Sequence, residues 1–425
     1  MIDPAALRRP PPIDRSRDRL VALGAIVVAV AFLLAALLTL GLPAPARLGL
    51  WLPLHLALAG GASTAIAGVL PFFVAAFAAA PPADARLRTA AVAAIAAGAL
   101  AVSVGFTAGA SAISVIGGSA FVGGVLLTAA AGLRPLGRAL GPSRGLVTRS
   151  YVVALGEVAV GAAISTLFVA GWPPVVEGWS RIKPAHAWLN LAGFVSLVIA
   201  TTLLHFFPTV VGARIAVRPS ARLTVGGLAG GAPLVAVGIA GGSDLLARVG
   251  AIAVAGGAAA IAVYSWRTWQ TRGRWTTDPG WHRFAMGGLI SAIVWFEVGV
   301  AIAVGRVLAW GADPASWRID AVAGPLVGGW MGLAVVASAT HLLPAIGPGD
   351  PTAHARQRQL LGRAAGPRLA LANAGVAGLA VGLPFGLGPP SVGGAVALAA
   401  AVGSTAVLLA AAVRIGMSRS ARSTA

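Results

Sequence analysis

Long apolar stretches alternate along the whole chain with short segments that are rich in arginine, proline and glycine. Each stretch holds about 20 residues or more, which is the length that an α-helix needs to cross the hydrocarbon core of a bilayer. No connecting segment is long enough to form a soluble domain. The pattern therefore predicts an all-α integral membrane protein. We expect twelve membrane-spanning helices, at residues 20–41, 50–79, 89–108, 111–133, 150–171, 185–211, 222–241, 244–265, 282–308, 321–346, 367–386 and 391–415.

Basic residues fall mainly in alternate connecting segments, including both ends of the chain. Loops rich in arginine and lysine usually remain on the cytoplasmic side of a membrane. The other connecting segments carry only Arg47, Arg181, Lys183 and Arg318. We therefore expect the N-terminal tail, residues 1–19, and the C-terminal tail, residues 417–425, to be cytoplasmic.

Three proline-containing motifs recur in related settings, namely GVLPFF, LHFFPTVVG and THLLPAIG, with prolines at Pro71, Pro208 and Pro344. They fall in the second, sixth and tenth predicted spans, and shorter echoes (VALG, VALG and FAMG) occur in the first, fifth and ninth. Units with an even number of helices keep one orientation, so an axis along the membrane normal relates them. We expect three four-helix repeats about a pseudo-threefold axis, at residues 20–149, 150–281 and 282–416.

Composition narrows the possible chemistry. Only 10% of the residues are charged and 58% are hydrophobic, whereas soluble domains carry about 25% charged residues. The absence of cysteine excludes disulfides, thiolate metal sites, iron–sulfur clusters and c-type haem, so histidine is the main possible metal ligand. The net charge of +19 indicates contact with anionic membrane lipid and not with nucleic acid, because the charges cluster in alternate loops. Arginine supplies 30 of the 31 basic residues, which suggests a GC-rich bacterium and hence its inner membrane.

Five of the six histidines lie within predicted spans; His282 opens the ninth span beside Trp281 and Arg283, as an interfacial anchor would, and the other four form two sets. His55 and His186 begin the second and sixth spans, near the predicted outer surface. His205 and His341 end the sixth and tenth spans, toward the cytoplasm. A b-type haem needs two axial imidazoles on facing helices, so each set is a candidate site for haem b or for a metal such as copper. The alternative for each imidazole is a structural or interfacial role, and His354 is expected in a solvated loop.

Two carboxylates, Glu157 and Glu297, also lie within predicted spans. Intramembrane acids usually pair, carry protons or serve a pathway, so either acid is a candidate proton relay or orienting group for an imidazole, or a structural acid. Glu297 could pair with Arg306. Asn190 shares a helix face with His186 at i, i+4 spacing and joins this group.

Several tryptophans lie near the ends of the predicted spans. Tryptophan is enriched where helices meet the membrane–water interface, so we expect an interfacial belt and not a ligand cage. The outer members of this belt are Trp51, Trp172, Trp179, Trp310 and Trp317.

Twelve spans in three four-helix arcs, with histidines on the second, sixth and tenth, resemble the core subunit of haem–copper oxidases and NnrS-type membrane proteins. The stretches WLPLHLALAGG and PAHAWLNLAGFVSLVIATTLLHFFPTVVGARI also resemble bacterial membrane modules that occur with copper nitrite reductase-like domains. By this resemblance His55 matches the ligand of the low-spin haem. The oxidases also carry a histidine-proline-tyrosine motif on the sixth span, two adjacent histidines on the seventh and His-x-His on the tenth. This chain lacks all three, so the usual copper site for oxygen reduction is not expected.

These observations favour a haem–copper-oxidase-like membrane redox protein, serving electron transfer or the handling of nitrogen oxides or copper, with a copper redox protein as a possible partner. No catalytic residue is assigned, and both enzymatic activity and oligomeric state stay open. One alternative is a proton-coupled secondary transporter that uses Glu157 and Glu297. Another is a cofactor-free membrane anchor or scaffold.

Overall fold

The computed structural model describes residues 16–138, 145–216, 218–273 and 282–423. These residues form helices and connecting turns, with no β-strand among them. Eleven helices are long and apolar enough to cross a membrane, and a bent helix pair raises the count to as many as twelve. The prediction of an all-α, polytopic membrane protein is therefore confirmed.

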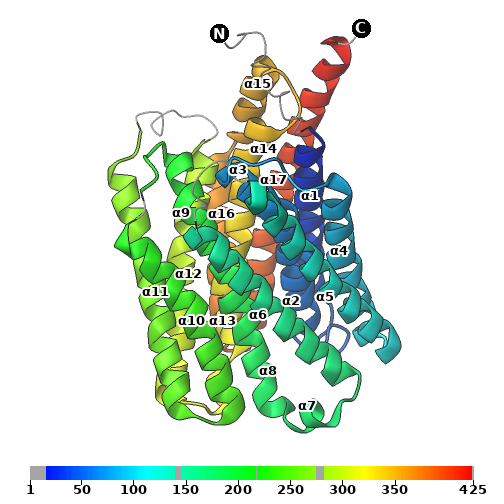
Figure 1. Cartoon of the computed structure of the whole chain (residues 1–425), viewed down its shortest axis with the longest axis vertical. Helices are drawn as coiled ribbons and strands as arrows, with labels where there is room; N and C mark the ends of the chain where they lie inside the picture. Colours follow the sequence, from blue (N-terminus) through cyan, green and yellow to red (C-terminus); the bar gives the residue numbers. More distant parts are fainter. Residues whose placement is uncertain (1–15, 139–144, 217, 274–281, 424–425) are drawn as a thin grey trace, which may run out of the picture.

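The long helices stand side by side as one bundle, and the start of α1 and the end of α17 lie at the same end of it (Figure 1). The helices that cross the bundle are α1 (Ser16–Thr39), α2 to α3 (Trp51–Phe77), α4 (Ala85–Thr107), α5 (Ser111–Leu133), α6 (Gly145–Val169), α8 to α9 (Trp179–Val211), α10 (Pro219–Gly241), α11 (Asp244–Gln270), α12 (His282–Trp310), the segment Pro314–Ile346 that ends in α14, α16 (Ala365–Gly382) and α17 (Gly388–Ser423).

Several boundaries and assignments differ from the prediction, and three of these differences affect named residues or the end of the chain. The sixth span begins at Trp179 and not at residue 185, so His186 lies about two turns inside the helix. His354 lies in α15 (Pro351–Leu361) and not in a loop, because Asp350 caps this helix and a proline occupies its first position. Helix α17 continues to Ser423, into the predicted C-terminal tail. The predicted N-terminal tail falls mostly outside the described residues.

The second, sixth and tenth spans share an irregularity, which is a stretch of wider, π-helical turns. These stretches are η2 (Leu56–Ala62), η4 (Leu189–Ser196) and η7 (Ala323–Gly332). Ser63 follows η2 and donates to the carbonyl of Leu58. Ser196 is the last residue of η4 and donates to the carbonyl of Leu191. Such turns occur often at functional sites because they reset which side chains face a neighbouring helix.

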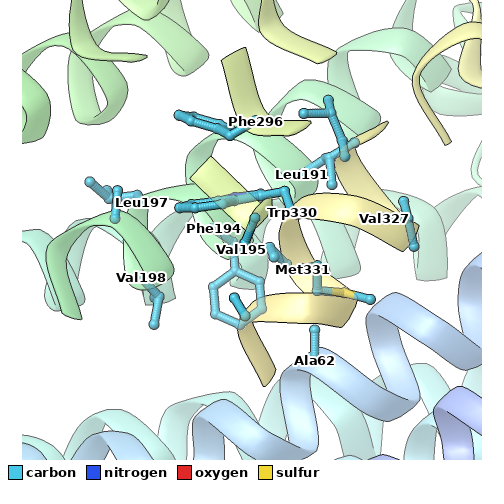
Figure 2. Close-up of a cluster of buried hydrophobic side chains, with 14 of the residues drawn as sticks. Ala62, Leu191, Phe194, Val195, Leu197, Val198, Phe296, Val327, Trp330 and Met331 are labelled. Carbon is cyan, nitrogen blue, oxygen red and sulfur yellow. The ribbon is translucent and has the colours of Figure 1, made fainter. Parts of the chain in front are cut away.

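The three π-helical stretches contact one another at the centre of the bundle. Figure 2 shows the apolar side chains that fill this centre, with Trp330 among them. Trp330 is fully buried, stacks on Phe296 with ring centroids 4.4 Å apart, and donates to the hydroxyl of Ser196 over 3.1 Å. The middle of the bundle is therefore packed with side chains.

Outside this centre, consecutive helices form tight hairpins, and α4 with α5 is one of the closest pairs. Glycines permit this approach, because a Cβ atom at Gly98 would lie 2.7 Å from the carbonyl oxygen of Gly117. Small residues at helix contacts are a common way to pack membrane helices. The hairpin forms one wall of the cavity described next.

Candidate functional site

A cavity of about 740 Å³ lies toward the end of the bundle that holds α7 (Pro173–Glu177), and the exposed lining residues Ser180 and Lys183 mark where it meets solvent. Its walls come from α2 (Trp51–His55) with η2, from α4, α5 and α6, and from α8 (Trp179–Trp188) with η4. Most of the lining side chains are apolar, and a few polar groups project among them. Volumes of about 300–1,000 Å³ with such a lining are typical of small-molecule and cofactor sites.

His55 lines one side of the cavity, at the last position of α2. Its Nδ1 lies 2.8 Å from the carbonyl oxygen of Trp51, one turn earlier in the same helix. A carbonyl oxygen can only accept, so Nδ1 carries the hydrogen and Nε2 keeps its lone pair. The indole of Trp51 stacks on this imidazole at 4.0 Å and on Phe106 of α4 at 4.3 Å, which fixes the ring plane.

His186 lines the same cavity from α8. Its Nδ1 lies 2.9 Å from the carbonyl oxygen of Gly161 in α6, so this imidazole also has its hydrogen on Nδ1 and a lone pair on Nε2. The amide of Asn190 donates to the backbone carbonyl of His186 over 2.7 Å. The same amide nitrogen lies 3.1 Å from Nδ1 of His186, so Asn190, one turn later on the same helix face, contacts both the backbone and the ring of His186.

A stacked tryptophan–phenylalanine pair lies near each imidazole, although only His55 stacks directly on its tryptophan. Trp179 stacks on Phe168 of α6 at 3.9 Å, and its ring centroid is 6.4 Å from that of His186. Trp51 and Trp179 therefore lie in the cavity wall beside the histidines, which corrects the expectation that they serve only as an interfacial belt. Their spacing from the histidines, four and seven residues, places each pair on one helix face and was visible in the sequence.

His205 and His341 are buried, with 5% and 7% of their surfaces exposed, in α9 (Leu197–Val211) and α14 (Leu333–Ile346). The ring of His205 is 4.8 Å from that of Phe77, and His341 meets Phe206 edge to face at 5.3 Å. His341 therefore packs against the residue that follows His205. Neither of these two histidines is among the residues that line the 740 Å³ cavity.

Glu157 is only 7% exposed, and neither of its carboxyl oxygens has a hydrogen-bond partner among the described residues. It packs against Gly193 of η4, where a Cβ atom would lie 1.4 Å from Oε2 of the acid. The predicted role of orienting an imidazole instead belongs to the carbonyl of Gly161, one turn along α6. Glu157 could still act as a proton-carrying group, since it lies beside the helix that bears His186.

Glu297 does not form the predicted pair with Arg306 in the described part of the chain. Arg306 donates to the backbone carbonyls of Ala315 and Ser316 and lies over the ring of Trp310. Glu297 is half-buried, and its Oε1 is buried without a partner among the described residues. Arg306 therefore closes the turn after α12, and Glu297 stays a candidate proton relay.

No protein-family model and no curated protein sequence matches the chain. A solved structure does match: a chain of a haem–copper terminal oxidase dimer, determined by cryo-electron microscopy. The TM-score is 0.63, and the match covers 94% of this chain and 83% of the oxidase chain.

The fold of this protein is therefore similar to that of the oxidase chain.

The sequence identity is 15%, so the match establishes the fold alone. It confirms the resemblance to a haem–copper oxidase at the level of a polytopic helical fold, and the three four-helix arcs stay a prediction. The likeness to NnrS-type proteins and to modules that accompany copper nitrite reductase-like domains stays a prediction. What the chain binds has to be inferred from its own side chains.

Proposed function

We propose that the protein is a membrane redox protein that binds haem b between His55 and His186. One observation carries the proposal: imidazoles from two different spans line one large cavity, and each has its Nδ1 hydrogen committed to a backbone carbonyl. Each Nε2 lone pair is then available to a metal. Histidines that ligate metals almost always donate their other N–H group in this way.

The residues around the cavity fit a haem. Its macrocycle is broad, flat and apolar, and the cavity is large, lined mainly by apolar side chains and flanked by two stacked aromatic pairs. A haem would supply one-electron chemistry at its iron. The protein's own contribution is to hold two imidazoles in fixed tautomers and planes and to limit the access of water.

Haem fits better than a bare copper ion. No group of three or more histidine, aspartate, glutamate or cysteine side chains suited to a metal ion occurs in residues 16–138, 145–216, 218–273 and 282–423. Copper sites for electron transfer use at least three protein ligands. A porphyrin provides the four equatorial ligands of its iron, so two imidazoles are enough.

We also propose a partner, a second ligand pair, an internal repeat and a location for the protein. Electron exchange with a copper redox protein, or the handling of nitrogen oxides, follows from the sequence resemblance. His205 and His341 are proposed as a second, separate ligand pair. The three four-helix repeats are supported by the π-helical stretches that recur in three spans and meet at the centre. The arginine-rich loops support a bacterial inner-membrane location with cytoplasmic termini.

Absorption spectroscopy tests the proposal. The purified protein, reconstituted with haem, should show a Soret band and the sharp reduced bands of a six-coordinate haem. His55→Ala and His186→Ala should each either change the positions of these bands or abolish them. His354→Ala is the matched control, because that imidazole lies in α15, outside the cavity. An unchanged spectrum in both cavity variants, or no haem binding by the wild-type protein, would refute the assignment.

A second function, a proton-coupled carrier, is favoured by one observation: the carboxyl of Glu157 is buried and has no hydrogen-bond partner among the described residues. It predicts substrate flux into proteoliposomes driven by a pH gradient and abolished by Glu157→Gln. Glu157 is not among the residues that line the large cavity, which is why the redox proposal comes first.

A further inference from the structure

Charge is distributed unevenly around the large cavity. Lys183 is the only lysine in the chain, and no other lysine, arginine, aspartate or glutamate is found among the described residues that line the cavity. It lies in α8 one turn before His186, and its side chain is exposed at the α7 end, where the cavity opens. A lysine in this position combines a compact positive charge in water with an alkyl stem over an apolar chamber.

Lys183 has no acidic partner among the residues that the structure describes. No aspartate or glutamate lines the cavity, and no ion pair involves Lys183 in the described parts of the chain. The nearby hydroxyls of α6 are engaged, because Ser165 donates to Gly161 or Ala162 and Thr166 donates to Ala162. Ser180, one turn before Lys183, is exposed at the mouth and also lines the cavity.

The cavity therefore has two chemically different ends. Donors from Lys183 and Ser180 stand at its mouth, and the large apolar side chains Phe121 and Phe194 are among those that line its walls. A ligand suited to this arrangement has a broad apolar body and an anionic group at one edge. Charge-assisted hydrogen bonds to such an anion are about twice as strong as neutral ones.

We propose that Lys183, assisted by Ser180, binds the carboxylate side chains of a porphyrin and so sets which edge of the macrocycle faces the cavity mouth. This inference rests on the proposed haem site and adds the orientation of its ligand. It also gives the single lysine of the chain a binding role. The arginine-rich loops and the pattern of histidines do not account for a lysine at this position.

The test compares metal-free protoporphyrin IX with its dimethyl ester, in which both carboxylates are neutralised. Binding is followed by quenching of tryptophan fluorescence in the purified, full-length protein. The wild-type protein should bind the free acid about tenfold more tightly than the ester, equivalent to ~1.4 kcal/mol. Lys183→Gln should reduce this preference to less than about threefold, and Lys183→Arg should retain most of it.

Arg181→Gln is the matched control. It removes one positive charge from the same end of α8, but Arg181 does not line the cavity and its guanidinium contacts the carbonyl of Ile239. A general effect of charge would lower the preference equally in both variants and would overturn the inference. A wild-type protein that binds acid and ester equally, or that binds neither, would overturn it while leaving the haem site standing. The haem site is tested separately, by the absorption spectrum of the protein reconstituted with haem.

Discussion

The contact between Glu157 and Gly193 gives the sharpest prediction about packing next to the candidate site. In the Gly193→Ala variant the new methyl group would be placed 1.4 Å from Oε2 of the acid. Ordinary contacts of a Cβ atom begin at about 3.4 Å, so the carboxyl group must retreat by about 2 Å. The acid is 7% exposed, and therefore the retreat has to displace neighbouring side chains.

Overpacking of this kind costs about 1–3 kcal/mol, and we expect the upper end because the overlap involves a buried group. Thermal unfolding of the detergent-purified protein, followed by intrinsic fluorescence, should therefore show a clearly lower midpoint for Gly193→Ala. In a Glu157→Ala background the same substitution should cost less than about 1 kcal/mol, since the colliding carboxyl is gone. The difference between the two costs is the coupling energy of the pair.

Gly156→Ala provides the control, because a Cβ atom at that neighbouring position of α6 meets nothing within 4 Å. It should be neutral or slightly stabilising, as alanine favours a helix over glycine by about 0.5–1 kcal/mol. The reasoning fails if Gly193→Ala unfolds at the same temperature as Gly156→Ala. It fails equally if removing the Glu157 side chain does not relieve the cost.

Three further predictions concern the rest of the bundle. Trp330→Ala should destabilise the protein by about 3–5 kcal/mol, because it empties the packed centre, and a lowered resistance to denaturing detergent would show this. Arg368→Gln should cost about 3 kcal/mol by removing the charged donor to the carbonyls of Leu361 and Arg363, measured as a lower unfolding midpoint; an unchanged midpoint would contradict the buried contacts. Tyr151→Phe should cost about 1 kcal/mol through loss of the bond to Thr202, and equal stability of the two proteins would show that the bond contributes nothing.

The spans were predictable because each one is a local property of the sequence. A run of about 20 apolar residues has to be helical in a bilayer, since no water is present to satisfy an open backbone. The prediction was less accurate at the start of the sixth span, where helix α8 continues outward through Arg181 and Lys183. Charged residues there resemble a loop by hydropathy, although their side chains can reach solvent from a helix.

The candidate site was predictable only in part. His55 and His186 were both identified from their places at the ends of two spans, and the structure brings them to one cavity. The hydrogen-bond partner of His186 was not predictable, because the carbonyl of Gly161 comes from a different span. Trp51 and Trp179 carried a helical spacing that pointed to the histidines, but the same residues also fit an interfacial belt.

The sequence by itself determined that the chain crosses a membrane many times, which of its few histidines lie within the bilayer, and that no cysteine chemistry is possible. These conclusions follow from composition and from patterns along a single helix. Only the tertiary structure decided that α2, α6 and α8 enclose a common cavity, that Glu157 faces Gly193 and that one lysine stands at the mouth. The reason is that the shape of a cavity and the residues that meet in it depend on contacts between helices. These contacts are set by side-chain packing between segments far apart in the chain.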